Sequence, residues 1–368
     1  MKNTRLYILV AIVFVALVAF CFDALAAPNV PTLQTNKPFV LRDSADNETA
    51  YFTLSEAMNA LKDKSGSFTL YLMRDYDASS EETVYQTGDY NLLVRSGQES
   101  KVFTLTNKKD FHFKLDDTIT NTYNDIVLDG GANDENIETG GGLFLQSEAK
   151  ATIGKGCTMQ RCSARIDEDY NKYFPISPIT LIDESTKLII KDAKIINNYC
   201  PHKDGMGIIE VSSNATVQIF NSLVEKNICS GLMTAPVIRM RQNGLLEIKN
   251  SKFIGNQAVY GGVIANYGSN LYISDSEFTS NISSSGGAIY YSIGPIFNLK
   301  NCTFTNNIGG GHGGAIYAKY CEQLKIDNCV FDSNLTGNWG GAIHFEDVED
   351  AKINNCTFTN NSAYSQGG

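Results

Sequence analysis

The chain has 368 residues, of which 43% are hydrophobic and 19% charged, and its formal net charge is −10 at pH 7. A chain of this length and hydrophobicity can bury a core of its own, unlike the small secreted domains that depend on disulfide bonds. The acidic balance, without basic runs, excludes phosphate backbones as partners, so we expect no nucleic-acid binding.

Residues 1–26 have the three parts of a secretory signal peptide. Lys2 and Arg5 supply the positive start, residues 6–22 form an apolar run, and Ala24 and Ala26 are the small residues that a signal peptidase accepts. The apolar run is shorter than the ~20 residues that a membrane-spanning helix needs. We therefore expect a secreted or cell-surface protein, located in the outer membrane if the source is a Gram-negative bacterium.

Residues 27–65 are expected to form an N-terminal cap with one short helix. Thr53 and Glu56 have the spacing of a capping box and precede apolar residues at helical intervals, which predicts a helix over 54–63. The strands that follow would leave an open sheet edge at this end, and the helix is placed to cover it.

Residues 66–245 carry strand patterns without a clear repeat. Apolar residues alternate at 67–75, 90–96, 101–107 and 111–117, and degenerate copies of a later repeat lie at 150–162, 187–198 and 216–227. Terminal repeats of an array are often irregular. We expect this region to form irregular coils of the same fold as the regular repeats.

Residues 246–368 repeat with a period close to 27. Glycine pairs start at 261, 286, 313, 340 and 367, in steps of 25, 27, 27 and 27, and a Phe-x-x-Asn motif runs in parallel. The corner glycines of the complete pairs are Gly261, Gly262, Gly286, Gly287, Gly313, Gly314, Gly340 and Gly341. The motif residues are Phe253, Phe278, Phe304, Phe331 and Phe358, followed by Asn256, Asn281, Asn307, Asn334 and Asn361.

Between these markers apolar residues alternate at every second position, and Ile, Phe, Tyr and Thr are frequent, which is typical of strands rather than of helical repeats. A unit of this length cannot bury its own apolar face, but a stack of units can. The pattern predicts an all-β fold, a right-handed single-stranded parallel β-helix of the pectin-lyase-like kind. Successive coils would lie about 4.8 Å apart.

Equivalent residues of successive coils should then stack in columns. Ile264, Ile289, Ile316 and Ile343 would form an aliphatic column and the repeated phenylalanines an aromatic one. The repeated asparagines sit where the backbone turns, so their amides can bond one another in a ladder. The glycine pairs allow positive φ or close backbone approach at a corner.

Eight cysteines remain after the predicted signal peptide. Cys302, Cys329 and Cys356 alternate with the phenylalanines, so we expect them to face inward as stacked thiols, because in-register parallel neighbours have poor disulfide geometry. The pairs that we expect to bond are Cys157 with Cys162 and Cys200 with Cys229.

The Gly-Gly-Ala-Ile and Phe-x-x-Asn motifs resemble the repeats of the polymorphic outer-membrane proteins of chlamydiae and related adhesin-like surface proteins. GGAI stands at 286–289, 313–316 and 340–343, and GGVI at 261–264. The resemblance implies a right-handed β-helical surface or secreted protein, often an adhesin passenger domain that a C-terminal β-barrel translocates and anchors. The sequence stops at Gly367-Gly368, so we expect membrane attachment only through a region beyond it.

A polysaccharide lyase or glycoside hydrolase on the same fold is the alternative function. Such sites need clustered carboxylates, or carboxylates with Ca²⁺ and a basic residue. Acidic candidates are Asp129, Asp134, Glu135, Glu138, Asp275, Asp327, Asp332, Glu346, Asp347, Glu349 and Asp350. We interpret them as solvated turns, with Asp275 and Asp327 at a turn position otherwise held by Asn, and no histidine spacing indicates zinc. We predict no catalytic residue, no metal and no cofactor.

One outward column is the candidate ligand-facing site. If the isoleucines of the column face inward, Tyr290, Tyr317 and His344 face outward on adjacent coils, where exposed rings could hold the flat faces of sugars or anchor a protein. A ladder of side chains that only supports the sheet is the alternative. We predict a non-catalytic, adhesin-like protein that presents a long face to a surface protein or glycan of a host or neighbouring cell.

Several Asn-x-Ser/Thr sequons occur along the chain. In a eukaryote, Asn47 and Asn214 would be the candidate glycosylation sites, because Asn281 and Asn334 belong to the expected ladder.

Overall fold

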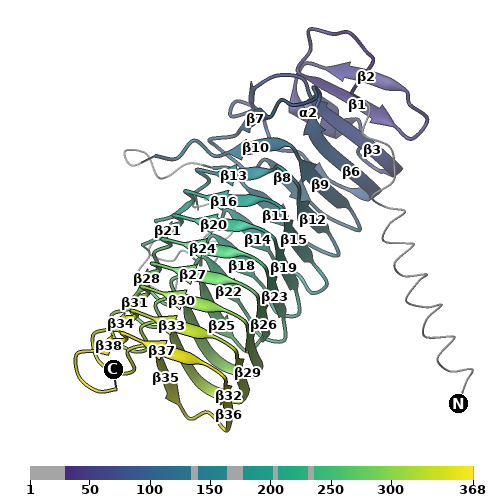
Figure 1. The fold of residues 1–368 in the computed structure, drawn as a ribbon. Helices are drawn as coiled ribbons and strands as arrows, with labels where there is room; N and C mark the ends of the chain where they lie inside the picture. Colours follow the sequence, from purple (N-terminus) through teal and green to yellow (C-terminus); the bar gives the residue numbers. More distant parts are fainter. Residues whose placement is uncertain (1–29, 134–139, 164–176, 202–205, 231–235, 368) are drawn as a thin grey trace, which may run out of the picture.

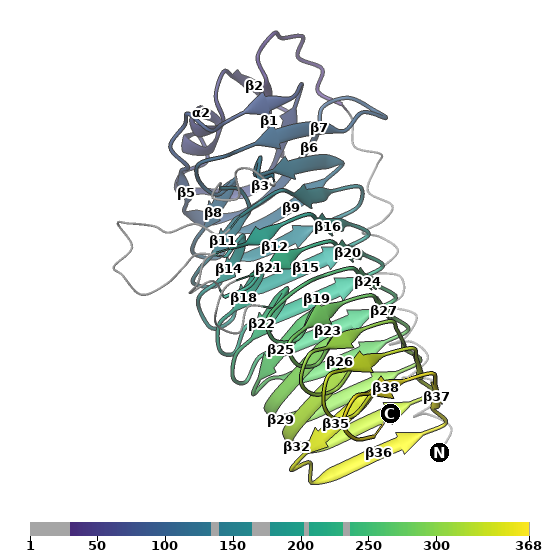
Figure 2. The ribbon, with the colours of Figure 1, turned by 90° about the vertical axis from the view of Figure 1, so that its left-hand side faces the viewer.

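The computed structural model describes residues 30–133, 140–163, 177–201, 206–230 and 236–367. The predicted signal peptide and the acidic group Asp134, Glu135 and Glu138 lie outside the described residues. The chain winds into an elongated parallel β-helix, as predicted, with strands stacked from the N-terminal to the C-terminal end (Figure 1 and Figure 2). Each regular coil contributes one strand segment to each of three faces, which we call the first, second and third face.

The first face follows the glycine corner of each repeat. Its strands are β5 (Tyr85–Gln86), β8 (Phe113–Leu115), β11 (Leu143–Leu145), β14 (Ile179–Leu181), β18 (Ile209–Val211), β22 (Ile238–Met240), β25 (Ile264–Tyr267), the first parts of β29 (Ile289–Lys300) and β32 (Ile316–Asp327), and β35 (Ile343–Glu346). β29 and β32 continue around the corner into the second face, because their pairing runs along both parts.

The second face stacks β3 (Lys64–Leu72), β6 (Gly88–Ser96), β9 (Thr120–Asn124), β12 (Lys150–Ile153), β15 (Lys187–Lys191), β19 (Thr216–Phe220), β23 (Leu245–Lys249), β26 (Asn270–Ser274), the ends of β29 and β32, and β36 (Asp350–Asn354). The third face stacks β4 (Tyr76–Asp77), β7 (Phe103–Thr106), β10 (Ile126–Asp129), β13 (Thr158–Gln160), β16 (Lys194–Ile196), β20 (Leu223–Glu225), β24 (Lys252–Ile254), β27 (Glu277–Thr279), β30 (Thr303–Thr305), β33 (Val330–Asp332) and β37 (Thr357–Thr359). Short strands close the coils: β17 (Tyr199–Cys200) with β21 (Ile228–Cys229), and β28 (Ile282–Ser283), β31 (Ile308–Gly309), β34 (Leu335–Thr336) and β38 (Ser362–Ala363).

The N-terminal end of the stack carries the predicted helix. α2 (Leu54–Asn59) is shorter than the predicted span and has the capping box in place, with Glu56 N donating to Thr53 Oγ1 at 3.1 Å. Its buried residues pack into the main core. β1 (Phe39–Asp43) pairs antiparallel with β2 (Glu48–Tyr51) on one side and with β3 on the other. The sequence did not predict β1 and β2, because these short strands belong to no repeat.

Repeated apolar residues stack inside the coils. Ile264, Ile289, Ile316 and Ile343 are register partners on successive coils, and the first three are fully buried. The phenylalanine rings of the third face stack at 4.8–4.9 Å between centroids with interplanar angles of 6–7°, which is the strand spacing of the sheet itself. Phe358, on the last described coil, is 46% exposed.

The repeated asparagines form a continuous buried ladder. The side-chain amide of each donates to Oδ1 of the asparagine on the next coil and to a backbone carbonyl of the preceding coil, as in Asn281 to Asn307 at 3.0 Å and to Phe253 O at 3.0 Å. The ladder extends two coils further towards the N-terminus than predicted, through Asn198 and Asn227. Every rung thereby satisfies polar groups that the core would otherwise leave without partners.

A second inward column combines serine and cysteine. The backbone N–H of Ser251 donates to Ser276 Oγ at 3.1 Å, and that of Cys302 donates to Cys329 Sγ at 3.4 Å. Each of these side chains also donates to the carbonyl two residues earlier, as in Cys329 to Asp327 O at 3.3 Å. Hydroxyl and thiol are therefore interchangeable members of one hydrogen-bonded column.

All the described cysteines are free thiols, so the two expected disulfides are wrong in this structure. Cys200 and Cys229 are in-register parallel neighbours, the same poor geometry that argues against bonds in the C-terminal column. The thiol of Cys162 donates to Gln160 O at 3.4 Å instead of bonding Cys157. Burial raises the pKa of Cys157 and Cys162, which keeps both protonated.

The glycine pairs form the corner before the first face. The first glycine of each pair has a φ of +58° to +71°, the left-handed region that favours glycine. A Cβ on it would collide with the carbonyl oxygen of the isoleucine three residues later. The second glycine faces the next coil, and a Cβ on Gly314 would collide with the carbonyl of Gly341.

Candidate functional site

The predicted ligand-facing residues lie on the outside of the first face. Tyr290 pairs with Tyr317, and Tyr317 with His344, on adjacent coils. Their inward neighbours belong to the main core, whereas the two tyrosines form a separate apolar cluster. The column is thus aligned and turned outward as the alternation requires.

The prediction that these rings are exposed is wrong. Tyr290 and Tyr317 are each only 6% exposed, and His344 is half-buried. The ring of Tyr290 is covered by Tyr260 and Tyr267, with centroids 5.4 and 5.7 Å away. The rings that the sequence singled out are therefore the floor of a layered aromatic cluster, not its surface.

The upper layer comes from the residue before each glycine pair. Tyr260, Ser285, His312, Trp339 and Gln366 occupy this position on successive coils. Isolated bridges join Tyr260 to Ser285, and Trp339 to both His312 and Gln366. These short contacts run beside the first face, so their side chains lie over its outward column.

His312 connects the two layers. Its ring lies 5.1 Å from that of Tyr317, 4.8 Å from that of Trp339 and 5.1 Å from that of His344. Trp339 is 43% exposed and is the single tryptophan of the chain. We call the residues Tyr260, Tyr267, Tyr290, His312, Tyr317, Trp339 and His344 the aromatic cluster.

Polar groups lie inside the aromatic cluster. The hydroxyl of Tyr317 donates to Glu346 Oε2, and burial together with this carboxylate raises the pKa of Tyr317. The pKa of His344 is lowered, first by burial and then by the neighbouring His312. Lys319 Nζ lies 5.8 and 5.9 Å from the ring centroids of Tyr290 and Tyr317. The cluster therefore offers donors and acceptors beside its apolar rings.

The corner between the first and second faces carries two large exposed side chains. Ile293 is 61% and Tyr320 47% exposed, and they have φ values of +54° and +52°. A β-branched residue in the left-handed region is a backbone outlier, and such strain collects at functional sites. The equivalent position is occupied by Gly268 on the coil before Ile293 and by Asp347 on the coil after Tyr320. Apolar side chains thus border this surface where glycine or aspartate would be less strained.

The acidic candidates are dispersed. Asp129 lies in β10 rather than in a solvated turn: it is 2% exposed and its Oδ1 accepts from Arg161 Nε at 2.9 Å. Burial acts to raise the pKa of Asp129, but the hydrogen bonds from Arg161 and from Gly131 N outweigh it, so the pKa is lowered. Asp275 has the expected turn conformation, but Asp327 lies at the end of β32, one residue before the turn residue Asn328.

The remaining acids of the last coils make individual contacts. Asp327 pairs with Lys325 at 2.5 Å and Asp350 with Lys352 at 2.8 Å. Within the described ranges, no group of three or more His, Cys, Asp or Glu residues is arranged to hold a metal ion. In the same part of the chain, no helix has the length and apolar character to cross a bilayer.

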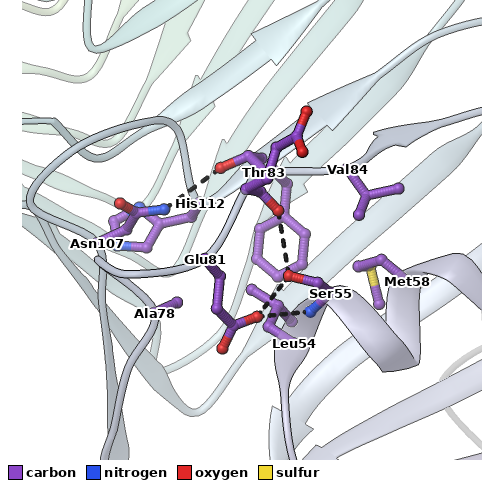
Figure 3. A pocket seen from close by; sticks show the side chains of 11 residues that line it. Leu54, Ser55, Met58, Ala78, Glu81, Thr83, Val84, Asn107 and His112 are labelled. Atoms are coloured by element: carbon purple, nitrogen blue, oxygen red, sulfur yellow. Dashed lines mark hydrogen bonds between the residues drawn. The ribbon is translucent and has the colours of Figure 1, made fainter.

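A cavity lies under the N-terminal helix (Figure 3). Ser55 donates to Glu81 Oε2 through its backbone N–H at 2.7 Å and its hydroxyl at 2.6 Å, and Asn107 and His112 line the far side. The cavity measures about 10 Å³, room for one water molecule. It is a small gap in the packing between the helix and the first coils.

A wider hollow lies on the second face. It measures about 210 Å³ and is lined by Glu247, Tyr272, Asn298, Lys300 and Lys325 among others. One ring and charges of both signs line it, so it lacks the layered rings of the aromatic cluster.

The two candidate glycosylation sites are exposed. Asn47 lies between β1 and β2, where its amide donates to Asp43 Oδ2 at 2.9 Å, and Asn214 lies in the turn before β19 with a φ of +63°. Asn281 and Asn334 are fully buried in the ladder.

Residues 236–367 match the family model described as right handed beta helix region. The match covers the regular coils and agrees with the predicted handedness.

Among curated proteins, the chain is similar to metabotropic glutamate receptor-like protein Q of Dictyostelium discoideum, with 30% identity over 139 residues. The match covers 34% of this chain and 11% of that relative.

The chain also aligns with two solved structures. The catalytic domain of Agl-KA aligns with 93% of this chain and 69% of its own, at 13% identity and a TM-score of 0.35. A mutant of the periplasmic alginate epimerase AlgG aligns with 88% of this chain and 96% of its own, at 9% identity and a TM-score of 0.28. At these scores neither likeness bears on what this chain does.

Proposed function

We propose that the protein is a secreted or cell-surface β-helix whose first face binds carbohydrate chains at the aromatic cluster, in the manner of an adhesin. The observation that carries the proposal is the layered cluster itself. Trp339 presents an exposed ring, and buried rings hold it from beneath through His312. An amphipathic ring fixed in this way offers a large contact area at a small entropic cost.

The polar groups fit the same ligand class. A sugar has apolar faces and a rim of hydroxyl groups, so it needs rings and hydrogen-bonding partners side by side. Glu346, His344 and Lys319 lie next to the rings of the cluster. The proposal includes export through the N-terminal signal peptide. It also includes an adhesin role of the kind that the resemblance to chlamydial repeats implies.

A polysaccharide-active enzyme is the second candidate, because one contact favours it. Tyr317, Glu346 and His344 are groups that can exchange protons, and coil stacking brings them together from positions up to 29 residues apart. This group is not visible as a motif in the sequence, because Tyr317 lies one repeat before His344 and Glu346.

Binding is tested by measuring the affinity of the purified protein for a panel of neutral and charged polysaccharides. Trp339→Ala should reduce affinity at least tenfold, and Tyr272→Ala, which removes a ring from the second face, should leave it unchanged. Full retention of binding by Trp339→Ala would refute the proposal.

The enzyme candidate is tested by following reducing and unsaturated ends in the same mixtures. Tyr317→Phe keeps the ring and removes the hydroxyl. If the natural protein releases new chain ends and Tyr317→Phe does not, the result favours the enzyme. If the natural protein binds polysaccharide but releases no new chain ends, the result favours the adhesin.

A further inference from the structure

Two arginines extend the outer surface of the first face beyond the aromatic cluster. Glu210, Arg239 and Ala265 precede Tyr290 in the same outward column, one on each coil. Arg241 follows Arg239 by two residues, so strand alternation turns it to the same side. Arg239 lies on β22 and Arg241 directly follows this strand, two coils before Tyr290, which is a distance of about 10 Å along the axis.

The arginines are joined to the aromatic cluster by Tyr267. The guanidinium carbon of Arg239 lies 5.4 Å from the centroid of the Tyr267 ring, and this ring contacts that of Tyr290 at 5.7 Å. Only the small Ala265 separates Arg239 from Tyr290 within the column. The surface from Arg239 to His344 is therefore continuous.

Among the residues that the structure describes, the local charge is not balanced. Glu210 is the acidic partner of both arginines, with Arg241 Nε at 2.7 Å from Oε1 and Arg239 Nε at 4.0 Å from Oε2. Arg239 Nε is buried and makes no hydrogen bond within the described residues, and Met206 Sδ lies against its Nη1. The side chain of Arg241 is 35% exposed and that of Arg239 17%. Two cations facing one carboxylate form a positive site on a chain of net charge −10.

We infer that Arg239 and Arg241 form an anion subsite of the carbohydrate-binding face and select glycans that carry carboxylate or sulfate groups. The inference rests on the proposed function and names its ligand class. The guanidinium group has a planar set of donors that matches both anions, and it keeps its charge at every physiological pH. A chain lying along the axis would place an acidic group at the arginines and a sugar ring at Trp339.

A purely structural role for the same residues makes a different prediction. An ion pair that only ties β18 to β22 would affect stability and leave ligand choice unchanged. Burial raises the pKa of Glu210, although both arginines act to lower it. An external anion would add a second acidic group to two arginines that share the single carboxylate of Glu210 among the described residues.

The test compares ligands that differ only in charge. De-esterified and fully methyl-esterified homogalacturonan share a backbone and differ in carboxylates, and dextran sulfate compared with neutral dextran isolates the second anion. We expect the natural protein to prefer the charged member of at least one pair, and Arg241→Gln to abolish that preference with a loss of about tenfold or more in affinity. Affinity for the neutral members should not change.

Lys325→Gln, which removes a cation from the second face, is the matched control and should leave all affinities unchanged. The melting temperature of Arg241→Gln shows that the variant is folded. A natural protein that binds neutral and charged members equally, or an Arg241→Gln variant that keeps the preference, overturns the inference and leaves the proposed function standing. Absence of binding to every glycan overturns both.

Discussion

Asn281 donates twice to one oxygen of Asn307: its backbone N–H lies 3.1 Å and its side-chain amide nitrogen 3.0 Å from Asn307 Oδ1. Both residues are fully buried. The same pair of contacts recurs between Asn256 and Asn281, and between Asn307 and Asn334. One side-chain oxygen per coil therefore satisfies two buried donors of its neighbour.

Asn307→Ala should lower the free energy of unfolding by about 2–5 kcal/mol, because it leaves two buried donors of Asn281 without an acceptor. Chemical denaturation measures the change. Asn298→Ala, at a half-buried outward position of β29, is the control and should change it by less than about 1 kcal/mol. Equal effects of the two substitutions would contradict the role of the ladder.

Gly314→Ala should destabilise the protein by about 3 kcal/mol or more, because the new Cβ meets the carbonyl of Gly341 on the next coil. Gly310→Ala should be nearly neutral, since its nearest contact is Ser284 Cα at 3.4 Å and its φ is not positive. Thermal melting of the two variants side by side checks this. A comparable loss at Gly310 would show that any added methyl group at this corner is harmful.

His112 should make stability depend on pH. Its Nδ1 accepts from Gly142 N at 2.8 Å and its Nε2 lies 3.1 Å from Asp129 O, so the neutral ring holds two parts of the chain together. Burial lowers its pKa to about 4 from 6.5. The unfolded chain takes up the proton first as pH falls, so up to about 3 kcal/mol of stability, present above pH 6.5, is lost between pH 6.5 and 4.

Unfolding free energies measured from pH 7.5 to 4 should therefore fall less steeply in His112→Gln than in the natural protein, although the variant starts from a lower value. The paired carboxylates with lowered pKa, such as Asp129, lose their contribution at lower pH. Parallel slopes in the two proteins would show that His112 does not titrate as its burial demands.

Cys329→Ser should change stability by less than about 1 kcal/mol, and Cys329→Val should cost about 1–3 kcal/mol. Serine reproduces both hydrogen bonds of the thiol and stands at the equivalent position in Ser251 and Ser276. Valine has a similar size but leaves the N–H of Cys302 without its acceptor. A stable valine variant would reduce the column to apolar packing.

The coil architecture could be predicted because its determinants repeat. Glycine pairs, inward isoleucines, phenylalanines and asparagines recur at one spacing, and each side chain meets its own copy on the next coil. The helix α2 was predicted from its capping box and from the apolar residues that follow at helical intervals. The β1–β2 hairpin has no repeated partner, and it left no comparable pattern.

The site was predicted only in part, because its upper layer is made of residues that do not repeat. Alternation placed Tyr290 and Tyr317 on the outer side, but it gave no information on what covers them. Trp339 and His312 each stand directly before a glycine pair, a signal in the sequence that places them on adjacent coils. The arginine site has no such marker, since Arg239 lies on an irregular coil where no repeated motif fixes its position.

One glycine corner occurs in each coil, so the chain between two successive corners forms one complete coil. The distance between the arginines and Trp339 can therefore change by the height of one coil at a time. Removal of residues 287–313 would join Gly286 to Gly314, keep the corner intact and bring the two sites about 4.8 Å closer. Insertion of one repeat would separate them by the same amount. This deletion would also remove Tyr290 and His312 from the aromatic cluster, whereas an inserted repeat would keep every member. Gain of single repeats can thus refit the protein to a differently spaced polymer without redesign of its interior.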